Sequence, residues 1–174
     1  MLRITEAGEI TNHNAVSAKK RFKKGAIVGM VTSMVDKQKV IDELNVAVGM
    51  EIAAIVQYSH NSYMIMGPWR GALTEELESF AKDEMEHMEY VSKKIVALGG
   101  VPTTKPGAIN APAKWRDMLE ADLAAENMAI EHYKAIAAMA DELDDVDLRK
   151  SIEDITSEEY GHKEALEKFL KEPR

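Results

Sequence analysis

The stretch Asp83-Glu84-Met85-Glu86-His87 carries a Glu and a His three residues apart. Residues with that spacing lie on one face of an α-helix, about one turn apart. The chain repeats the Glu-x-x-His pair 75 residues later, and upstream of each pair stands a Glu with a Tyr seven residues after it. One offset relates both halves of the set, which comprises Glu51, Tyr58, Glu84 and His87, then Glu126, Tyr133, Glu159 and His162. The pattern predicts a duplicated helical hairpin whose two copies close around a pair of metal ions.

The hydrophobic pattern around these residues is helical. Apolar side chains recur at three- and four-residue spacing and predict helices over about 37–66, 74–98, 113–139 and 146–171. Gly67-Pro68 is expected to end the first helix, and Thr74 to cap the start of the second. Gly99-Gly100 is expected to end the second helix, and the acidic stretch 141–145 reads as a turn.

The connection lengths indicate how these helices are arranged. The first and third connections are short, so each joins an antiparallel pair of helices. The middle connection of about 14 residues reaches up to roughly 46 Å, and a helix of about 27 residues is roughly 40 Å long. The middle connection can therefore return the chain along the whole bundle. We expect an all-α four-helix bundle of two hairpins with a long crossover, in which the repeated Glu and His residues fall at one level.

The composition sets limits on the type of protein. The chain has 174 residues, a net charge of −8 and no Cys, which excludes disulfides, thiolate zinc sites and iron–sulfur clusters. We divide it into an N-terminal arm, residues 1–38, with a possible short helix over 17–34, and a bundle, residues 39–172. The arm carries seven basic and three acidic residues, including the cluster Lys19 to Lys24. Nucleic-acid binding is not expected except through that cluster. No apolar run is long enough to span a membrane, and we expect a cytoplasmic protein.

The six repeated acidic and imidazole groups indicate the chemistry of the site. A Glu three residues before a His can be a solvated surface pair, but Glu51 and Glu126 lie on apolar stripes. Four carboxylates and two imidazoles in a bundle core would be costly without partners. Two divalent metal ions offset that cost, and mixed carboxylate and imidazole ligands suit iron or manganese. The same ligand arrangement is known from other di-metal helix bundles, so the rule is general rather than particular to this chain.

With these residues in view, the sequence resembles the ferritin-like family, most closely bacterioferritins and the related Dps-like ferritins. The resemblance extends from about Val40 to Phe169. It is carried by five stretches, namely Glu51 to Tyr58 (EIAAIVQY), Asp83 to His87 (DEMEH), Leu98 to Pro102 (LGGVP), Asp122 to Glu126 (DLAAE) and Glu158 to His162 (EEYGH).

The resemblance implies a ferroxidase centre that binds two iron ions per chain. It implies that Glu51 and Glu126 are terminal ligands and that Glu84 and Glu159 bridge the ions. It also implies that His87 and His162 each bind one iron. For Tyr58 and Tyr133 we favour a hydrogen bond to a ligand carboxylate over an electron-relay role. Asp83 and Glu158 are expected to orient the His ligands.

The resemblance also bears on haem and on assembly. Met85 is one residue after Glu84, so it points about 100° away around the helix. It matches the position of the haem-ligating Met of bacterioferritins, so haem b is one interpretation and packing at a subunit interface is the other. The family implies a hollow homo-oligomer. The absence of a fifth helix before Arg174 favours a cage of 12 subunits over one of 24.

We therefore expect an iron-oxidising protein that stores and detoxifies iron, with oxygen or hydrogen peroxide as the oxidant and a role in oxidative stress. The alternative is a non-storage di-iron or di-manganese redox enzyme of the peroxidase, catalase or hydroxylase type. A hydroxylase would need a pocket beside the metals. Two further interpretations of the sequence are a nucleoid-binding protein that uses Lys19 to Lys24, and a metal-free bundle.

Overall fold

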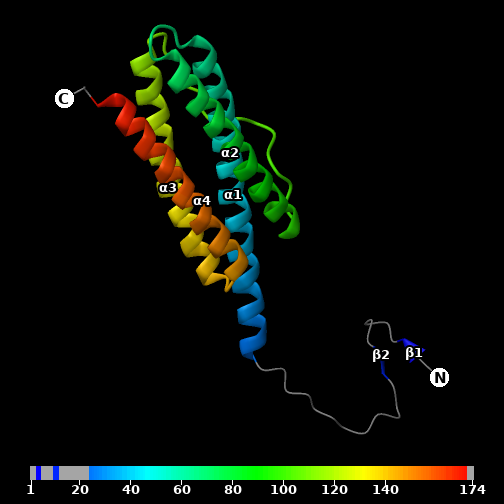
Figure 1. The fold of residues 1–174 in the computed structure, drawn as a ribbon. Helices are drawn as coiled ribbons and strands as arrows, with labels where there is room; N and C mark the ends of the chain where they lie inside the picture. The colour runs from blue at the N-terminus through cyan, green and yellow to red at the C-terminus, as the bar shows by residue number, and fades with distance from the viewer. Residues whose placement is uncertain (1–2, 5–9, 12–23, 172–174) are drawn as a thin grey trace. The chain divides into compact units, whose positions relative to one another are not determined.

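The chain is described by a computed structural model that covers the backbone of residues 3–4, 10–11 and 24–171 and the side chains of residues 37–171. It contains four helices: α1 (Lys24–Met64), α2 (Arg70–Ala97), α3 (Trp115–Glu142) and α4 (Val146–Leu170). The segment from Thr32 onward forms one unit. Within this unit the helices run side by side (Figure 1), and the prediction of an all-α four-helix bundle is confirmed.

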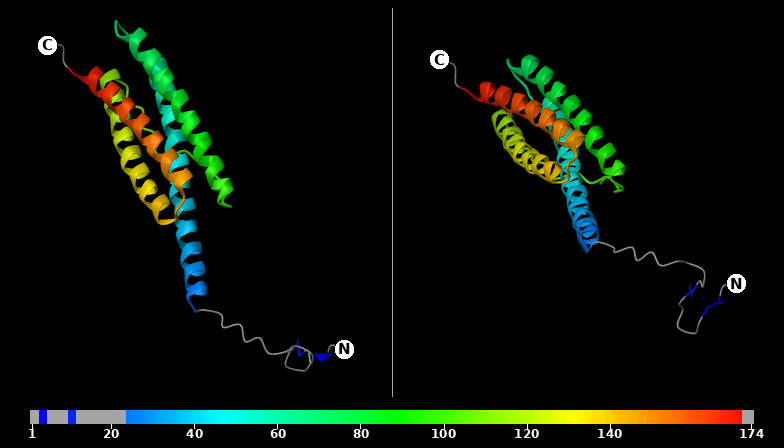
Figure 2. Two further views of the ribbon diagram at one scale, coloured as in Figure 1. Left: turned by 60° about the horizontal axis from the view of Figure 1, so that its bottom comes forward. Right: turned by 90° about the horizontal axis from the view of Figure 1, so that it is seen from below.

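The four helices form two antiparallel hairpins. Helix α1 pairs with α2 and helix α3 pairs with α4, and the same pairs lie side by side in two further views (Figure 2). The crossover, residues 98–114, returns along α1 from the end of α2 to the start of α3. It is tied to α1 by a hydrogen bond of 2.6 Å from the Gly107 N–H to the Gly49 carbonyl oxygen. A Cβ atom at Gly107 would lie 3.1 Å from that oxygen, so a larger residue would push the crossover away from α1.

Residues Met1–Val31 form a separate unit by their internal contacts. Its described residues include a two-residue antiparallel ladder between β1 (Arg3–Ile4) and β2 (Ile10–Thr11), which the sequence analysis did not predict. Helix α1 is continuous from Lys24 through residues 38 and 39, where we placed the boundary between arm and bundle. Most of the basic cluster, Lys19 to Lys23, lies outside the described residues.

The start of α2 differs from the sequence prediction. The helix begins at Arg70, after Trp69, and not behind Thr74. Gly67 adopts a positive φ of 100°, a conformation that suits glycine, so the turn is short and the next helix starts early. Thr74 lies inside the helix, and its hydroxyl donates a hydrogen bond of 3.3 Å to the Ser62 carbonyl oxygen, which ties α2 to α1. Helix α3 likewise begins two residues later and ends three residues later than expected.

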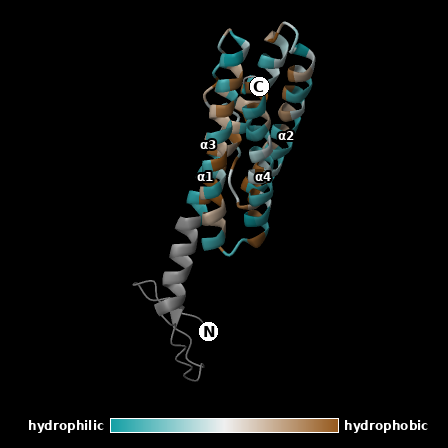
Figure 3. Ribbon diagram, turned by 60° about the vertical axis from the view of Figure 1, so that its left-hand side comes forward, coloured by the Kyte–Doolittle hydropathy of each residue, from teal (hydrophilic) through white to brown (hydrophobic). Residues whose placement is uncertain are grey.

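The bundle core consists of two hydrophobic clusters separated by a layer of buried charged residues. One cluster contains Leu44, Ile95, Ile136 and Ile152 among its buried members. The other contains Leu77, Leu119 and Leu166. Along every helix, the buried Glu and His residues lie between positions of the two clusters. Figure 3 shows hydrophobic and hydrophilic residues alternating along the coloured part of each helix, as expected for amphipathic helices. Across the described chain, no helix is both long and apolar enough to cross a membrane.

Candidate metal centre

The six repeated Glu and His residues come together in the middle of the bundle. Each helix contributes to the set. Helix α1 provides Glu51, α2 provides Glu84 and His87, α3 provides Glu126, and α4 provides Glu159 and His162. Every one of these side chains is at most 5% exposed. In a helical hairpin, two residues at equal distances from the turn lie at the same height. Glu51 and Glu84 are related in this way in the first hairpin, and Glu126 and Glu159 in the second.

The donor atoms divide into two overlapping groups. In each group one carboxylate oxygen or ring nitrogen per residue lies within 4.8 Å of the others, and the two groups share Glu84 and Glu159. The first group adds Glu51 and His87, and the second adds Glu126 and His162. This geometry offers two adjacent cation sites with two carboxylates common to both.

The imidazole rings face this cluster with their Nδ1 atoms. His87 Nδ1 lies 3.2 Å from both Glu84 Oε2 and Glu159 Oε1. His162 Nδ1 lies 3.2 Å from Glu84 Oε1 and 3.3 Å from Glu159 Oε2. Each imidazole therefore lies against both of the shared carboxylates.

The outer Nε2 atoms of both rings contact acids on the opposite hairpin. His87 Nε2 lies 2.8 Å from Glu158 Oε2 on α4, and His162 Nε2 lies 3.3 Å from Asp83 Oδ2 on α2. An acid at Nε2 holds a proton there and leaves Nδ1 as the available ligand atom.

The two tyrosines make the same kind of reciprocal contact. Tyr58 donates a hydrogen bond from α1 to Glu126 on α3, and Tyr133 donates one from α3 to Glu51 on α1. Both rings are almost fully buried. Each hydroxyl thus fixes the carboxylate of the other half of the repeat, not the carboxylate seven residues before it.

The carboxyl groups of the centre differ in their proton affinity. Burial raises the pKa of Glu51 and Glu126 well above 4.5, and the negative charges of Glu84 and Glu159 raise it further. Burial acts in the same direction on Glu84 and Glu159, but their interactions with His162 and His87 outweigh it. The pKa of Glu84 is therefore lowered, and that of Glu159 is lowered to about 2.

The pKa of each imidazole in the centre is raised. Burial disfavours their charged form, but the carboxylates of Glu159 and Glu84 more than offset it. The pKa of His87 rises to about 12 and that of His162 to about 10. In the metal-free centre, two imidazolium ions thus balance two carboxylates and supply positive charge that bound metal ions would otherwise supply.

The centre retains buried polar atoms that suit a metal. Glu126 Oε2 is buried and completes no hydrogen bond, and Glu84 Oε1, both Glu159 carboxylate oxygens and His162 Nδ1 have ion-pair contacts at 3.2–3.3 Å that lack hydrogen-bond geometry. Unsatisfied buried carboxylate oxygens are costly and rare in native proteins. Hard oxygen donors with one imidazole per site fit iron or manganese. The residues present therefore fit a pair of divalent cations.

A cavity of about 230 Å³ adjoins the centre. Its inner wall includes the four Glu residues of the centre, and its sides are mostly small residues of α1 and α3, among them Ala53, Ala54, Ala121 and Ala125. Its outer wall is the crossover, at Gly107, Ala108 and Asn110, which are exposed. The cavity therefore extends from the carboxylates to the exposed crossover.

Beside this cavity lies a polar cluster that we did not predict. Asp122 is fully buried and accepts hydrogen bonds from Gln57 at 2.8 Å and from Asn61 at 2.9 Å. Gln57 Oε1 accepts the backbone N–H of Asn110 at 2.7 Å, which holds the crossover. Burial raises the pKa of Asp122 to about 6, and its amide donors partly offset this. Polar residues at positions 57, 61 and 122 on otherwise buried stripes were the available signal in the sequence.

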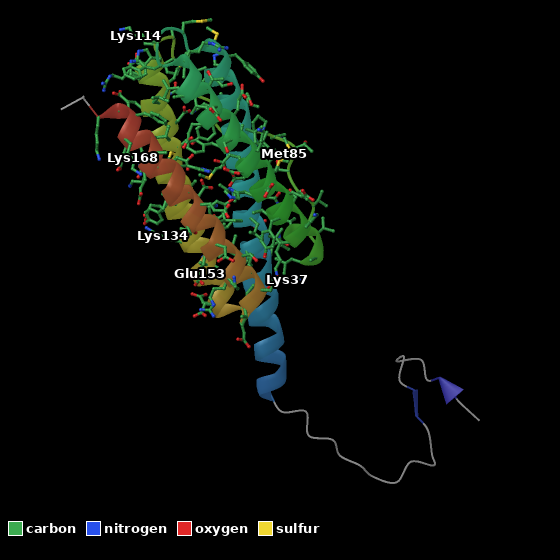
Figure 4. The ribbon with its side chains drawn as sticks, in the orientation of Figure 1. Lys37, Met85, Lys114, Lys134, Glu153 and Lys168 are labelled. Carbon is green, nitrogen blue, oxygen red and sulfur yellow. The ribbon has the colours of Figure 1, made fainter. Side chains whose placement is uncertain are left out.

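Met85 is outside the centre. Its side chain is 53% exposed, and Figure 4 shows it on the side of α2 away from α3 and α4.

The fold and the buried cluster together define a four-helix bundle with a carboxylate and imidazole centre built for two cations. Residues 41–174 match the family described as the ferritin-like domain. The chain therefore belongs to the ferritin-like family.

Bacterioferritins are among its relatives. The bacterioferritin of Desulfovibrio desulfuricans is 35% identical over 127 residues, which are 72% of this chain and 71% of that protein. The bacterioferritin of Brucella melitensis is 32% identical over 143 residues, 79% of this chain and 86% of that one.

Two solved structures share the fold. A ferritin-like, diiron-carboxylate protein from Bacillus anthracis superposes with a TM-score of 0.77 at 33% identity, covering 78% of this chain and 98% of that one. Rhodobacter capsulatus bacterioferritin, described with a metal-free dinuclear site and haem iron, superposes with a TM-score of 0.69 at 26% identity. The match covers 76% of this chain and 84% of that one.

Proposed function

We propose that this protein binds two Fe(II) ions as substrate, oxidises them and retains the product as stored iron. The observation that carries the proposal is the pair of overlapping donor groups that share Glu84 and Glu159. A single-ion site would not need two common carboxylates. The similarity to bacterioferritins supports the choice of iron over manganese.

Each residue of the centre has a role in this proposal. Glu84 and Glu159 bridge the two ions, while Glu51 and His87 complete one site and Glu126 and His162 complete the other. Four carboxylates balance the charge of two divalent ions. Oxidation to Fe(III) adds positive charge, and hard carboxylate oxygens stabilise that state.

The residues around the ligands hold their geometry. The hydroxyls of Tyr58 and Tyr133 fix the terminal carboxylates, and Asp83 and Glu158 fix the His rings through Nε2. Such supporting contacts orient ligands and tune a metal site. The apolar sides of the cavity limit water near the centre, while its outer wall lets small molecules approach.

The proposed reaction is an oxidation with a simple balance. Two Fe(II) lose one electron each, and oxygen with two protons becomes hydrogen peroxide. With hydrogen peroxide as the oxidant, the two electrons and two protons yield two water molecules. The imidazolium and carboxyl protons that leave the ligands on metal binding lie close to where these protons are consumed.

The cavity favours a second candidate function, a non-storage di-metal redox enzyme. A small, mainly apolar space beside the metals is what a hydroxylase would need for an organic substrate. Storage and catalysis on an organic molecule differ in assembly size and in the amount of iron retained.

Two further features belong to this proposal. The chain assembles as a homo-oligomeric cage, with 12 subunits proposed and 24 as the alternative. Haem b bound through Met85 is proposed on the exposure of this side chain. A haem absorption band in the visible spectrum of the isolated protein, lost in Met85→Leu, tests it.

The deciding experiment is aerobic Fe(II) oxidation by the metal-free protein after separation by size. We expect fast oxidation in a fraction of hundreds of kilodaltons, with far more than two irons retained per chain. Oxidation that stops at two irons per chain in a small species would favour the redox enzyme instead.

A double variant tests the residues of the centre. We expect Glu84→Ala with His162→Ala to abolish both binding and oxidation. The matched control is Glu153→Ala, because Glu153 lies on α4 but is exposed at the surface, as Figure 4 shows, and should leave both unchanged. Unaltered iron binding in the double variant would refute the proposed site.

A further inference from the structure

A second cavity lies at the end of the bundle where α1 turns into α2. It has a volume of about 460 Å³ and lies between the start of α2, the start of α3 and the end of α4. Its lining shares no residue with the cavity beside the metal centre. It is therefore a distinct cavity from the one beside the metal centre.

The walls of this cavity are unusually aromatic. The chain has only two Trp residues, and both line the cavity, at Trp69 and Trp115. Phe169, one of three Phe residues in the chain, forms another part of the wall. Trp69 is 61% exposed, so its indole face is open to a molecule that enters. Flat aromatic walls of this kind stack on planar rings.

Three of the other five lining residues are cationic, and the remaining two are Ala72 and Leu73. Arg116, Lys168 and Lys171 line the cavity, and none of its lining residues within the described part of the chain is acidic. This contrasts with the whole chain, which has 30 acidic and 22 basic residues. Lys168 is 70% exposed and lies 3.7 Å from Glu164, a weak surface pair that leaves the ammonium accessible.

Arg116 fixes part of this wall. Its guanidinium donates a hydrogen bond of 3.1 Å to the Leu170 carbonyl oxygen and lies 5.7 Å from the centre of the Trp115 ring. The end of α4 is thereby held against the start of α3. The Trp115 indole is positioned by this cation–π contact, which also fixes one side of the cavity.

We propose that this cavity binds a planar aromatic ring that carries phosphate groups, as nucleotides and flavin nucleotides do. The ring stacks on the Trp69 and Trp115 indoles, and the phosphates lie against the ammonium groups of Lys168 and Lys171. A volume of about 460 Å³ falls in the range of pockets that hold small organic ligands. A ligand that joins an aromatic ring to phosphate uses both the aromatic and the cationic wall. It should therefore bind more tightly than a neutral aromatic molecule or inorganic phosphate alone.

The two Trp residues make the test direct, because all tryptophan fluorescence of the chain comes from this cavity. We expect ADP, added to the full-length assembled protein, to quench this fluorescence with saturation. Adenosine and inorganic phosphate should each bind at least about tenfold more weakly. A parallel titration with FMN, followed by its own fluorescence polarisation, distinguishes the two ring sizes, and the tighter ligand identifies the source.

Two lysines on α4 provide a matched pair of variants. Lys168 pairs with Glu164 four residues before it, and Lys150, 73% exposed, pairs with Asp154 four residues after it. Lys168→Gln should weaken binding several-fold, whereas Lys150→Gln should leave it unchanged, since Lys150 is 18 residues away along the helix, about 27 Å. Both positions are exposed, so neither substitution threatens folding.

Several outcomes would overturn the proposal. One is the absence of saturable quenching by ADP and of FMN binding, and another is equal weakening in both lysine variants. Tryptophan fluorescence that acrylamide cannot quench in the assembled protein would show that a second copy of the chain covers the cavity. Binding of ADP or FMN should persist in the variant with Glu84→Ala and His162→Ala. The test of this cavity therefore does not depend on the metal centre.

Discussion

Loading the metal-free centre with Fe(II) should release protons in a predictable number. The pKa of His87 is raised to about 12 and that of His162 to about 10, so both rings are protonated at pH 7. A ring nitrogen must lose its proton to bind a metal ion. Nδ1 faces the carboxylates while Nε2 keeps its acid partner, so each ring should lose the Nδ1 proton.

The carboxyl groups set the upper limit on the number of protons released when the two ions bind. Because their pKa is raised, Glu51 and Glu126 can together release as many as two further protons. The expected release is therefore about two to four protons for each pair of ions bound. Because each released proton makes the equilibrium tenfold more favourable per pH unit, binding of the pair should strengthen at least about a hundredfold from pH 6 to pH 7.

The assay is an anaerobic titration of the metal-free protein in weak buffer with a pH indicator. His162→Gln should release fewer protons. His132→Gln is the control, because the His132 ring lies outside the centre, 3.0 Å from the Glu43 carbonyl oxygen, and should change nothing. Binding of both ions with fewer than two protons released would refute the charge state described here.

Four further predictions concern the stability of the metal-free protein, measured by urea denaturation. Leu119→Ala removes a fully buried core side chain and should lower the free energy of unfolding by about 2–5 kcal/mol. Tyr133→Phe removes a buried hydrogen bond and should cost about 1–3 kcal/mol, whereas Tyr63→Phe, at a side chain 66% exposed, should have little effect. The pKa of Glu159 is lowered from 4.5 to about 2, so its stabilising contribution should disappear as the pH falls through that range. The pKa of His87 is raised from 6.5 to about 12, so its contribution is complete below pH 6.5 and should be lost as the pH rises; a stability that does not fall from pH 6.5 to pH 10 would contradict this.

The centre could be predicted because its residues obey a rule of spacing. Helical periodicity fixed the face of Glu51 and Glu126, and connection lengths fixed the topology that brings them to one level. The hydrogen-bond partners of Tyr58 and Tyr133 were harder to predict, because spacing within one helix does not tell which facing helix a hydroxyl reaches.

Other features had no such rule. Thr74 is a good cap by residue type, yet the turn at Gly67 lets α2 begin at Arg70, so local geometry overrode propensity. Asp122 and its partners Gln57 and Asn61 have no acid or amide counterparts in the repeat, because the matching positions are Ala47, His132 and Ile136. A buried polar cluster of that kind depends on three-dimensional contacts that periodicity alone does not reveal.

The reciprocal contacts of the centre bear on the origin of the chain. Tyr58, Tyr133, Asp83 and Glu158 each act on a residue of the opposite hairpin. One hairpin alone would therefore be incomplete, whereas two identical hairpins related by a twofold axis would complete the same set. The 75-residue repeat thus has the form of an ancestral dimer fused into one chain. In a single chain, unlike a symmetric dimer, the two halves can carry different residues, and the unmatched Asp122 cluster is one such difference.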